Sequence, residues 1–69
     1  MEFNESFGNN LKYLREQHGI TQLQLSRETG IAQSKISRWE AGINAPSLYD
    51  ALVLSDYYGM TVNEIAKLD

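Results

Sequence analysis

The sequence places an apolar residue directly after a glycine four times, and this repeat constrains the fold more than any other feature. The pairs occupy positions 19–20, 30–31, 42–43 and 59–60. Glycine adopts a positive φ without steric strain, so it commonly ends a helix, and the apolar residue after it packs back on the last turn. In three pairs a leucine stands six residues before the apolar member: Leu14, Leu25 and Leu54. Four helix ends of this kind predict an all-α fold.

Helix-starting signals fall between these stops. A serine or threonine before a helix accepts a backbone hydrogen bond, and a suitable polar residue three positions later completes a capping box. Such boxes begin at Thr21 and Thr61, and Ser47 has Asp50 at the equivalent position. No segment shows the sustained alternation of a strand. Five short helices are therefore predicted, starting near Asn4 or Ser6, at Thr21, after Gly30, at Ser47 and at Thr61.

The fourth predicted helix carries more apolar residues than one buried face holds. Its inward face is expected to comprise Leu48, Ala51, Leu52, Leu54, Ser55 and Tyr58. The apolar residues then left over on the last two helices are Tyr49, Val53, Tyr57 and Leu68. A cluster of exposed apolar residues is typical of a contact with another protein. We therefore expect a homodimer that pairs through the last two helices.

Size and composition limit the number of domains and the available chemistry. The chain has 69 residues, of which 42% are hydrophobic, so a single domain over 1–69 with one small core is expected. With no cysteine and one histidine, neither a metal site nor a cofactor is expected. No apolar run approaches the roughly 18 residues of a membrane span, and the first residues do not resemble a signal peptide. These features favour a cytoplasmic protein.

Charge is unevenly distributed along the chain. The formal net charge is −3, which counts against nucleic-acid binding because basic domains are the norm there. Between Leu11 and Arg38, however, there are five basic and two acidic residues, whereas the rest of the chain has one basic and seven acidic residues. The central segment is therefore positively charged, and the acidic residues lie toward both ends.

Residues 21–42 hold the pattern with the clearest functional meaning, two short helices separated by a turn at Gly30. In the second helix, Ile36 and Trp39 share one face at helical spacing and are predicted to be buried. Polar side chains that hydrogen-bond base edges and phosphates occupy the outer face. These residues are Gln33, Ser34, Lys35, Ser37 and Arg38.

This arrangement resembles the phage-repressor and Cro-type (lambda-repressor-like, XRE) helix-turn-helix family. The resemblance extends from about Phe7 to Leu68 and implies a compact five-helix DNA-binding domain, with the helix-turn-helix in the second and third helices. Within the motif at 21–42, it rests on Gln22, Ser26, Gly30, Trp39, Glu40 and Gly42.

In this family the second helix of the motif enters the major groove of double-stranded DNA. At the matching positions, the resemblance implies that Gln33, Ser34 and Arg38 read bases. Glutamine pairs well with adenine and arginine with guanine, which supports these roles. Lys35 and Ser37 are secondary candidates for DNA contact.

The resemblance also implies roles for residues outside the recognition helix. Gln22 corresponds to a residue that contacts a phosphate and supports Gln33. Arg15 and Glu40 correspond to an ion pair between the first helix and the end of the third. This pair would orient the recognition helix.

Three residues depart from the family pattern. Ala32 replaces the usual serine or threonine cap of the recognition helix, which loses about 0.5–2 kcal/mol of stabilisation. Ser26 and Ser55 stand where alanine is commoner. Each hydroxyl is expected to bond a carbonyl in the preceding turn.

A sequence-specific transcriptional regulator is the favoured function, acting on a double-stranded DNA operator as a small repressor, a phage-type switch or a controller protein. The alternative is a protein-interaction module of the same fold, antitoxin-like or an anti-regulator, without strong DNA binding. The acidic net charge motivates this alternative. An enzyme is not expected, because the sequence shows no spaced nucleophile–base pair, no phosphate loop and no paired acids.

Overall fold

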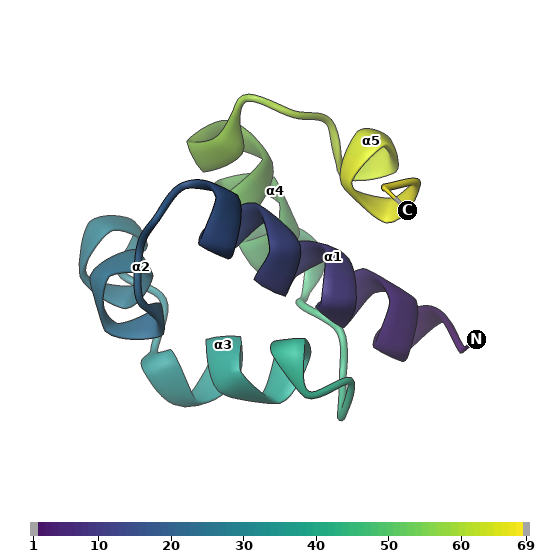
Figure 1. Cartoon of the computed structure of the whole chain (residues 1–69), viewed down its shortest axis with the longest axis horizontal. Helices are drawn as coiled ribbons and strands as arrows, with labels where there is room; N and C mark the ends of the chain where they lie inside the picture. The colour runs from purple at the N-terminus through teal and green to yellow at the C-terminus, as the bar shows by residue number, and fades with distance from the viewer. Residues whose placement is uncertain (1, 69) are drawn as a thin grey trace.

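The computed structural model describes residues 2–68, which form five α-helices and no strand (Figure 1). The helices are α1 (Phe3–Gln17), α2 (Gln22–Thr29), α3 (Gln33–Glu40), α4 (Leu48–Tyr58) and α5 (Val62–Ala66). This confirms the all-α prediction and places the predicted helix-turn-helix in α2 and α3. Met1 and Asp69, the ends of the domain predicted over 1–69, lie outside the described residues.

The four predicted helix stops all have their glycine at positive φ, between 66° and 77°. At three of them, the N–H after the glycine donates to the carbonyl five residues earlier, as Ile20 does to Arg15 at 3.3 Å. The stop at Gly30 differs. There the Ile31 N–H donates to the Thr29 hydroxyl at 3.2 Å. The glycine repeat thus marks helix ends correctly, although the ends use two bonding patterns.

Most helices also begin directly after the capping residues that the sequence predicts. Both predicted capping boxes form, at the starts of α2 and α5. Ser47 caps α4 by accepting a hydrogen bond from the Asp50 N–H at 3.2 Å. α3 begins without a side-chain cap, as expected from Ala32.

The first helix begins one residue before the nearer of its two predicted starts, and neither Asn4 nor Ser6 caps it. α1 begins at Phe3, ahead of both Asn4 and Ser6. The Phe3 ring stacks on Phe7 one turn later, with ring centroids 5.3 Å apart. Apolar pairs at this spacing stabilise a helix, so the contact favours the earlier start.

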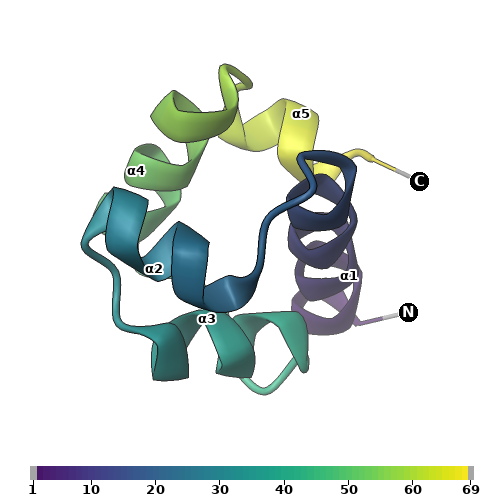
Figure 2. The ribbon, with the colours of Figure 1, turned by 60° about the vertical axis from the view of Figure 1, so that its left-hand side comes forward.

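The helices pack around one core to which each contributes. α3 lies along the lower edge of the molecule, and α4 and α5 lie on the other side of the core (Figures 1 and 2). α3 packs most extensively on α1, and α2 contacts both α3 and α4. The buried members of the core are Phe7, Leu11, Leu14, Leu25, Ile31, Ile36, Trp39, Leu54, Tyr58 and Ile65.

The inward face predicted for α4 was partly wrong. Ala51, Leu54 and Tyr58 are buried, but Leu48 and Leu52 are 76% and 54% exposed. One residue step turns a helix by about 100°, so Leu52 does not share the face that contains Ala51. Three residues predicted to be left over are instead partly buried against the core: Val53, Tyr57 and Leu68.

Ser26 and Ser55 hydrogen-bond forward along the chain, so the expectation of a carbonyl in the preceding turn was wrong. The Ser26 hydroxyl donates to the Ile31 carbonyl at 2.6 Å, and the Ser55 hydroxyl donates to the Met60 carbonyl. The chain reverses direction at the glycine that ends each helix, so these carbonyls lie beside the ends of α2 and α4. Each serine thereby fixes the loop that leaves its helix.

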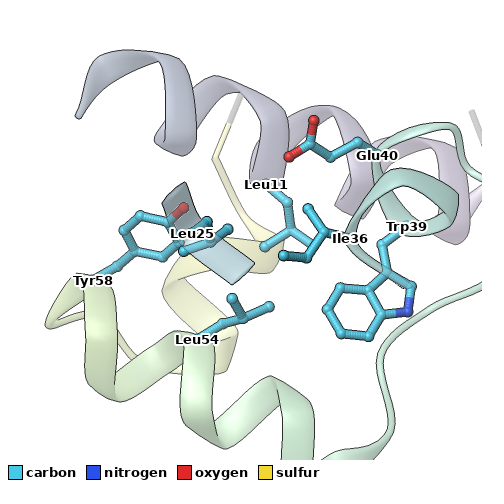
Figure 3. A pocket seen from close by; sticks show the side chains of 7 residues that line it. All are labelled: Leu11, Leu25, Ile36, Trp39, Glu40, Leu54 and Tyr58. Atoms are coloured by element: carbon cyan, nitrogen blue, oxygen red, sulfur yellow. The ribbon is translucent and has the colours of Figure 1, made fainter. Parts of the chain in front are cut away.

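A cavity of about 10 Å³ lies in the core, and Figure 3 shows the side chains around it. A single water molecule needs about 10–15 Å³, so this cavity has no room for a ligand. The Tyr58 hydroxyl group is buried and has no hydrogen-bond partner among residues 2–68. Its burial raises the pKa of Tyr58 to about 12.

Candidate nucleic-acid interface

α3 buries one face and exposes the other. Ile36 and Trp39 are 2% and 4% exposed and belong to the core, as expected from their spacing. In Figures 1 and 2 no other helix covers α3 from below. The five polar residues predicted for its outer face are all exposed: Gln33, Ser34, Lys35, Ser37 and Arg38.

Helical rotation divides these five side chains into a centre and two flanks. At about 100° per residue, Ser34 and Arg38 lie about 40° apart and opposite the buried face. Gln33 and Ser37 lie on one flank of this centre, and Lys35 lies on the other. The face therefore presents one arginine centrally and one lysine at its edge.

A close backbone approach holds the C-terminal end of α3 against α1. A Cβ atom added to Gly8 would lie 2.1 Å from the carbonyl oxygen of Trp39. Cβ atoms essentially never approach another atom that closely, so any side chain at this position would force the two helices apart. Gly8 thus sets the distance between α1 and α3.

An ion pair with little exposure links the same two helices. The Arg15 Nε donates to Glu40 Oε2 at 2.8 Å, and its Nη2 donates to Oε1 at 2.9 Å. The two side chains are only 12% and 5% exposed. The hydrogen bond to Glu40 raises the pKa of Arg15 above its usual value. The remaining terminal nitrogen of Arg15 donates to the Ile20 carbonyl at 2.8 Å, so the loop after α1 joins the same network.

Gln22 also belongs to this network. Its Nε2 donates to Glu40 Oε1 at 3.1 Å, so one carboxylate holds α1, α2 and α3 together. The resemblance implied support of Gln33 by Gln22, but no hydrogen bond joins these two side chains in the described part of the chain. The structure instead fixes Gln22 by way of Glu40.

Lys35 has an acidic partner that the sequence reasoning missed. Its Nζ lies 3.5 Å from Oδ2 of Asp50 in the first turn of α4. Asp50 is only 9% exposed. The sequence pattern assigned this aspartate to a capping box, and its N–H does bond Ser47, but its carboxylate lies near Lys35. No local pattern indicates this contact, because the loop between α3 and α4 brings the two residues together.

Residues 2–68 contain neither a metal-binding cluster nor a membrane-spanning helix. No group of three or more histidine, aspartate or glutamate side chains is placed to hold a metal ion in this range. Across the same residues, every helix is too short or too polar to span a membrane.

The sequence profile of the helix-turn-helix family matches residues 11–65. The chain belongs to the helix-turn-helix family. The match begins within α1 and ends within α5, so it includes the whole motif together with Arg15 of α1, whereas Gly8 lies before it. The resemblance to phage-repressor-type proteins is thereby confirmed.

Curated relatives of this helix-turn-helix chain include proteins named as regulators. It is 32% identical over 65 residues to the HTH-type transcriptional activator BcrR of Enterococcus faecalis, across 94% of this chain and 30% of BcrR. It is 33% identical over 57 residues to an uncharacterized HTH-type transcriptional regulator of Methanocaldococcus jannaschii, across 83% of this chain and 86% of that protein.

Another relative is named as an antitoxin and not as a transcriptional regulator. Antitoxin PezA of Streptococcus pneumoniae is 42% identical over 40 residues, across 58% of this chain and 25% of PezA. The chain therefore spans less than a third of the length of BcrR and of PezA. No solved structure gives a significant match.

Proposed function

We propose that this helix-turn-helix chain is a transcriptional regulator that binds double-stranded DNA sequence-specifically and reads the major groove with α3. The exposed polar face of α3, on a helix whose other face is packed on α1, carries this proposal. The major groove is about 12 Å wide and admits one α-helix, whose diameter is about 10–12 Å. A helix fixed on one side and polar on the other suits that docking.

The arrangement on α3 supports distinct roles for its side chains. Ser34 and Arg38 lie at the centre of the outer face, where a docked helix meets base edges. Gln33 is the first residue of α3 and would approach the groove from that end. Ser37 and Lys35 lie on opposite flanks, near the two sugar–phosphate strands. We assign base reading to the first three and secondary contacts to the flanks.

The charge distribution is compatible with this docking despite the acidic total. Five of the six basic side chains lie between Leu11 and Arg38, which spans the C-terminal half of α1, all of α2 and most of α3. Most of the acidic residues lie outside that segment, and Glu40 is neutralised by Arg15. The helices that would approach DNA are therefore more basic than the rest of the domain.

We further propose that two copies pair through α4 and α5. Leu48, Tyr49 and Leu52 on the first half of α4 are 76%, 74% and 54% exposed, which is unusual for neighbouring apolar side chains. Each chain has one recognition helix, and a two-fold pair would supply two half-sites on the operator. The exposed surface on α4 supports the predicted homodimer, with its centre nearer to α4 than to α5.

The proposed regulator acts in the cytoplasm by occupying its operator, as a small repressor, a phage-type switch or a controller protein. Two relatives named as HTH-type transcriptional regulators, one of them an activator, support regulation of transcription in general. An alternative is a protein-interaction module of the antitoxin or anti-regulator kind. The net charge of −3 and the likeness to antitoxin PezA favour this second function.

Selection of bound sequences from a random duplex pool tests the proposed function and identifies the preferred site. Gln33→Ala and Arg38→Ala are then compared with the wild type on single-base variants of that site. Each substitution should cost about 1–3 kcal/mol on the best duplex and relax preference at particular base positions. Lys67→Ala, just after α5, is the matched control and should keep the wild-type profile.

Two results would contradict the proposal in different ways. If both α3 variants keep the wild-type preference, α3 is not the reading helix. If the wild type binds no duplex even at low salt, the interaction module becomes the better explanation, since electrostatic binding to DNA strengthens as salt falls.

A further inference from the structure

A polar hollow of about 340 Å³ opens on one side of α3, where α1, α2 and α3 meet. A water molecule needs only about 10–15 Å³ of such space, so a phosphate group has room there. The residues that line it are Lys12, Arg15, Gln22, Ser37, Glu40 and Ala41.

The charges in this hollow leave one cation uncommitted. The Glu40 carboxylate accepts two hydrogen bonds from Arg15 and one from Gln22, so it is neutralised within the network. Lys12 is exposed and makes no ion pair with any residue from 2 to 68. The hollow therefore carries one net positive charge and attracts an anion.

The position of the hollow relative to α3 indicates which kind of anion would bind there. Ser37 lines the hollow and also lies on one flank of the outer face of α3. The sugar–phosphate strands form the two walls of the major groove, so a helix lying in the groove has one strand along each flank. The hollow lies on the flank where such a strand would pass.

We infer that this hollow binds a phosphate of the DNA backbone, with Lys12 and Ser37 as direct contacts that complete the site around Gln22. The inference rests on the proposed function. The Lys12 ammonium supplies the charge, and the Ser37 hydroxyl donates a hydrogen bond. Gln22 uses one amide hydrogen on Glu40 and keeps a second one to donate.

The opposite flank of α3 has a second hollow, whose cations are Lys35 and Arg38, and Arg38 is already assigned to base reading. Lys35 lies there, and the nearby carboxylate of Asp50 offsets its charge. Lys12 on α1 is therefore the stronger candidate for a full phosphate contact, although Lys35 is the lysine on the recognition helix. Sequence reasoning missed Lys12, because only the packing of α1 on α3 places it in the same hollow as Ser37.

Salt titration of duplex binding tests this inference, with Lys12→Gln as the main variant and Lys67→Gln as the matched charge control. Both lysines are exposed, so both variants should fold. A phosphate contact contributes about 0.9 to the slope of log affinity against log salt concentration. Lys12→Gln should lower the slope by about that amount and, at about 0.1 M salt, weaken binding roughly five- to tenfold on preferred and unrelated duplexes alike. Lys67→Gln should change neither quantity.

Duplexes with single methylphosphonate substitutions identify the phosphate concerned. The wild type should lose affinity when one particular phosphate in a half-site is neutralised, and Lys12→Gln should be insensitive to that substitution alone. Ser37→Ala should show part of the same insensitivity, without a change of charge. Inorganic phosphate alone should not saturate the wild type at millimolar concentration, and saturable binding would reassign the hollow to a free anion.

The inference is overturned if the wild type binds duplexes while Lys12→Gln keeps the slope of Lys67→Gln. It is also overturned if Lys12→Gln alters base preference and leaves the slope intact. Absence of duplex binding by the wild type would instead overturn the proposed function, and this inference with it.

Discussion

Replacing Gly8 with alanine tests the closest contact between α1 and the recognition helix. Helix propensity alone predicts that this change stabilises α1 by about 1 kcal/mol. The structure predicts the opposite sign for the whole domain. The added Cβ would lie 2.1 Å from the carbonyl oxygen of Trp39 and 3.4 Å from the backbone nitrogen of Gly42. Both are backbone atoms, so no side-chain rotation relieves the overlap.

The magnitude follows from the distance. A tolerable contact of at least 3.0 Å requires α1 and α3 to separate by about 0.9 Å at this point. Overpacking of this kind costs about 1–3 kcal/mol, and contact with rigid backbone favours the upper end of that range. After subtraction of the propensity gain, the free energy of unfolding should fall by about 2 kcal/mol.

Urea unfolding followed by circular dichroism measures this loss directly. The matched control is a peptide of residues 3–17 with the same substitution, in which α3 is absent and helicity should rise. Unchanged or greater stability of the complete chain carrying Gly8→Ala would refute the close approach. Loss of helicity in the peptide would instead locate the effect within α1.

Three other predictions concern the ion pair, the buried tyrosine and the exposed surface of α4. Arg15→Ala and Glu40→Ala should each destabilise the domain by about 3 kcal/mol in urea unfolding, and the double variant should lose clearly less than the sum; strict additivity would argue against the pair. Tyr58→Phe should be neutral or stabilising by about 1 kcal/mol near pH 7, because the buried hydroxyl has no partner in the described residues. Burial raises the pKa of Tyr58 from 10.0 to about 12, so the folded state favours the neutral side chain; wild-type stability should decline as pH rises across that interval, and Tyr58→Phe should decline less. Equal pH profiles would contradict the burial of Tyr58. Leu52→Lys should shift sedimentation toward monomer with unchanged helical content, and an unchanged dimer population would place the interface elsewhere.

The sequence by itself determined where most helices begin and end. Capping boxes and glycine stops act within one turn, so Thr21, Thr61 and the four glycines marked boundaries that the structure confirms. Helical spacing likewise separated the buried Ile36 and Trp39 from the polar outer face of α3. These features depend only on residues close together in the chain, which explains their success.

The sequence predicted the buried face of α4 less well. Apolar residues occur nearly all round this helix, so spacing alone does not select the face that turns inward. The neighbouring helices select it, and they leave Leu52 exposed while Val53 packs against the core. The surface proposed for dimerisation could therefore be placed on the first half of α4 only with the structure in hand.

Only the tertiary structure decided which distant polar side chains meet. The Asn10 side chain donates to the Ile65 carbonyl at 2.9 Å, across a separation of 55 residues, and so holds the end of α5 against α1. Lys35 lies beside Asp50, and Lys12 shares a hollow with Ser37, for the same kind of reason. Each contact depends on how the helices cross and how closely they approach. Periodicity along one helix specifies which of its faces is apolar. The packing of the helices decides which residues of the other helices contact that face.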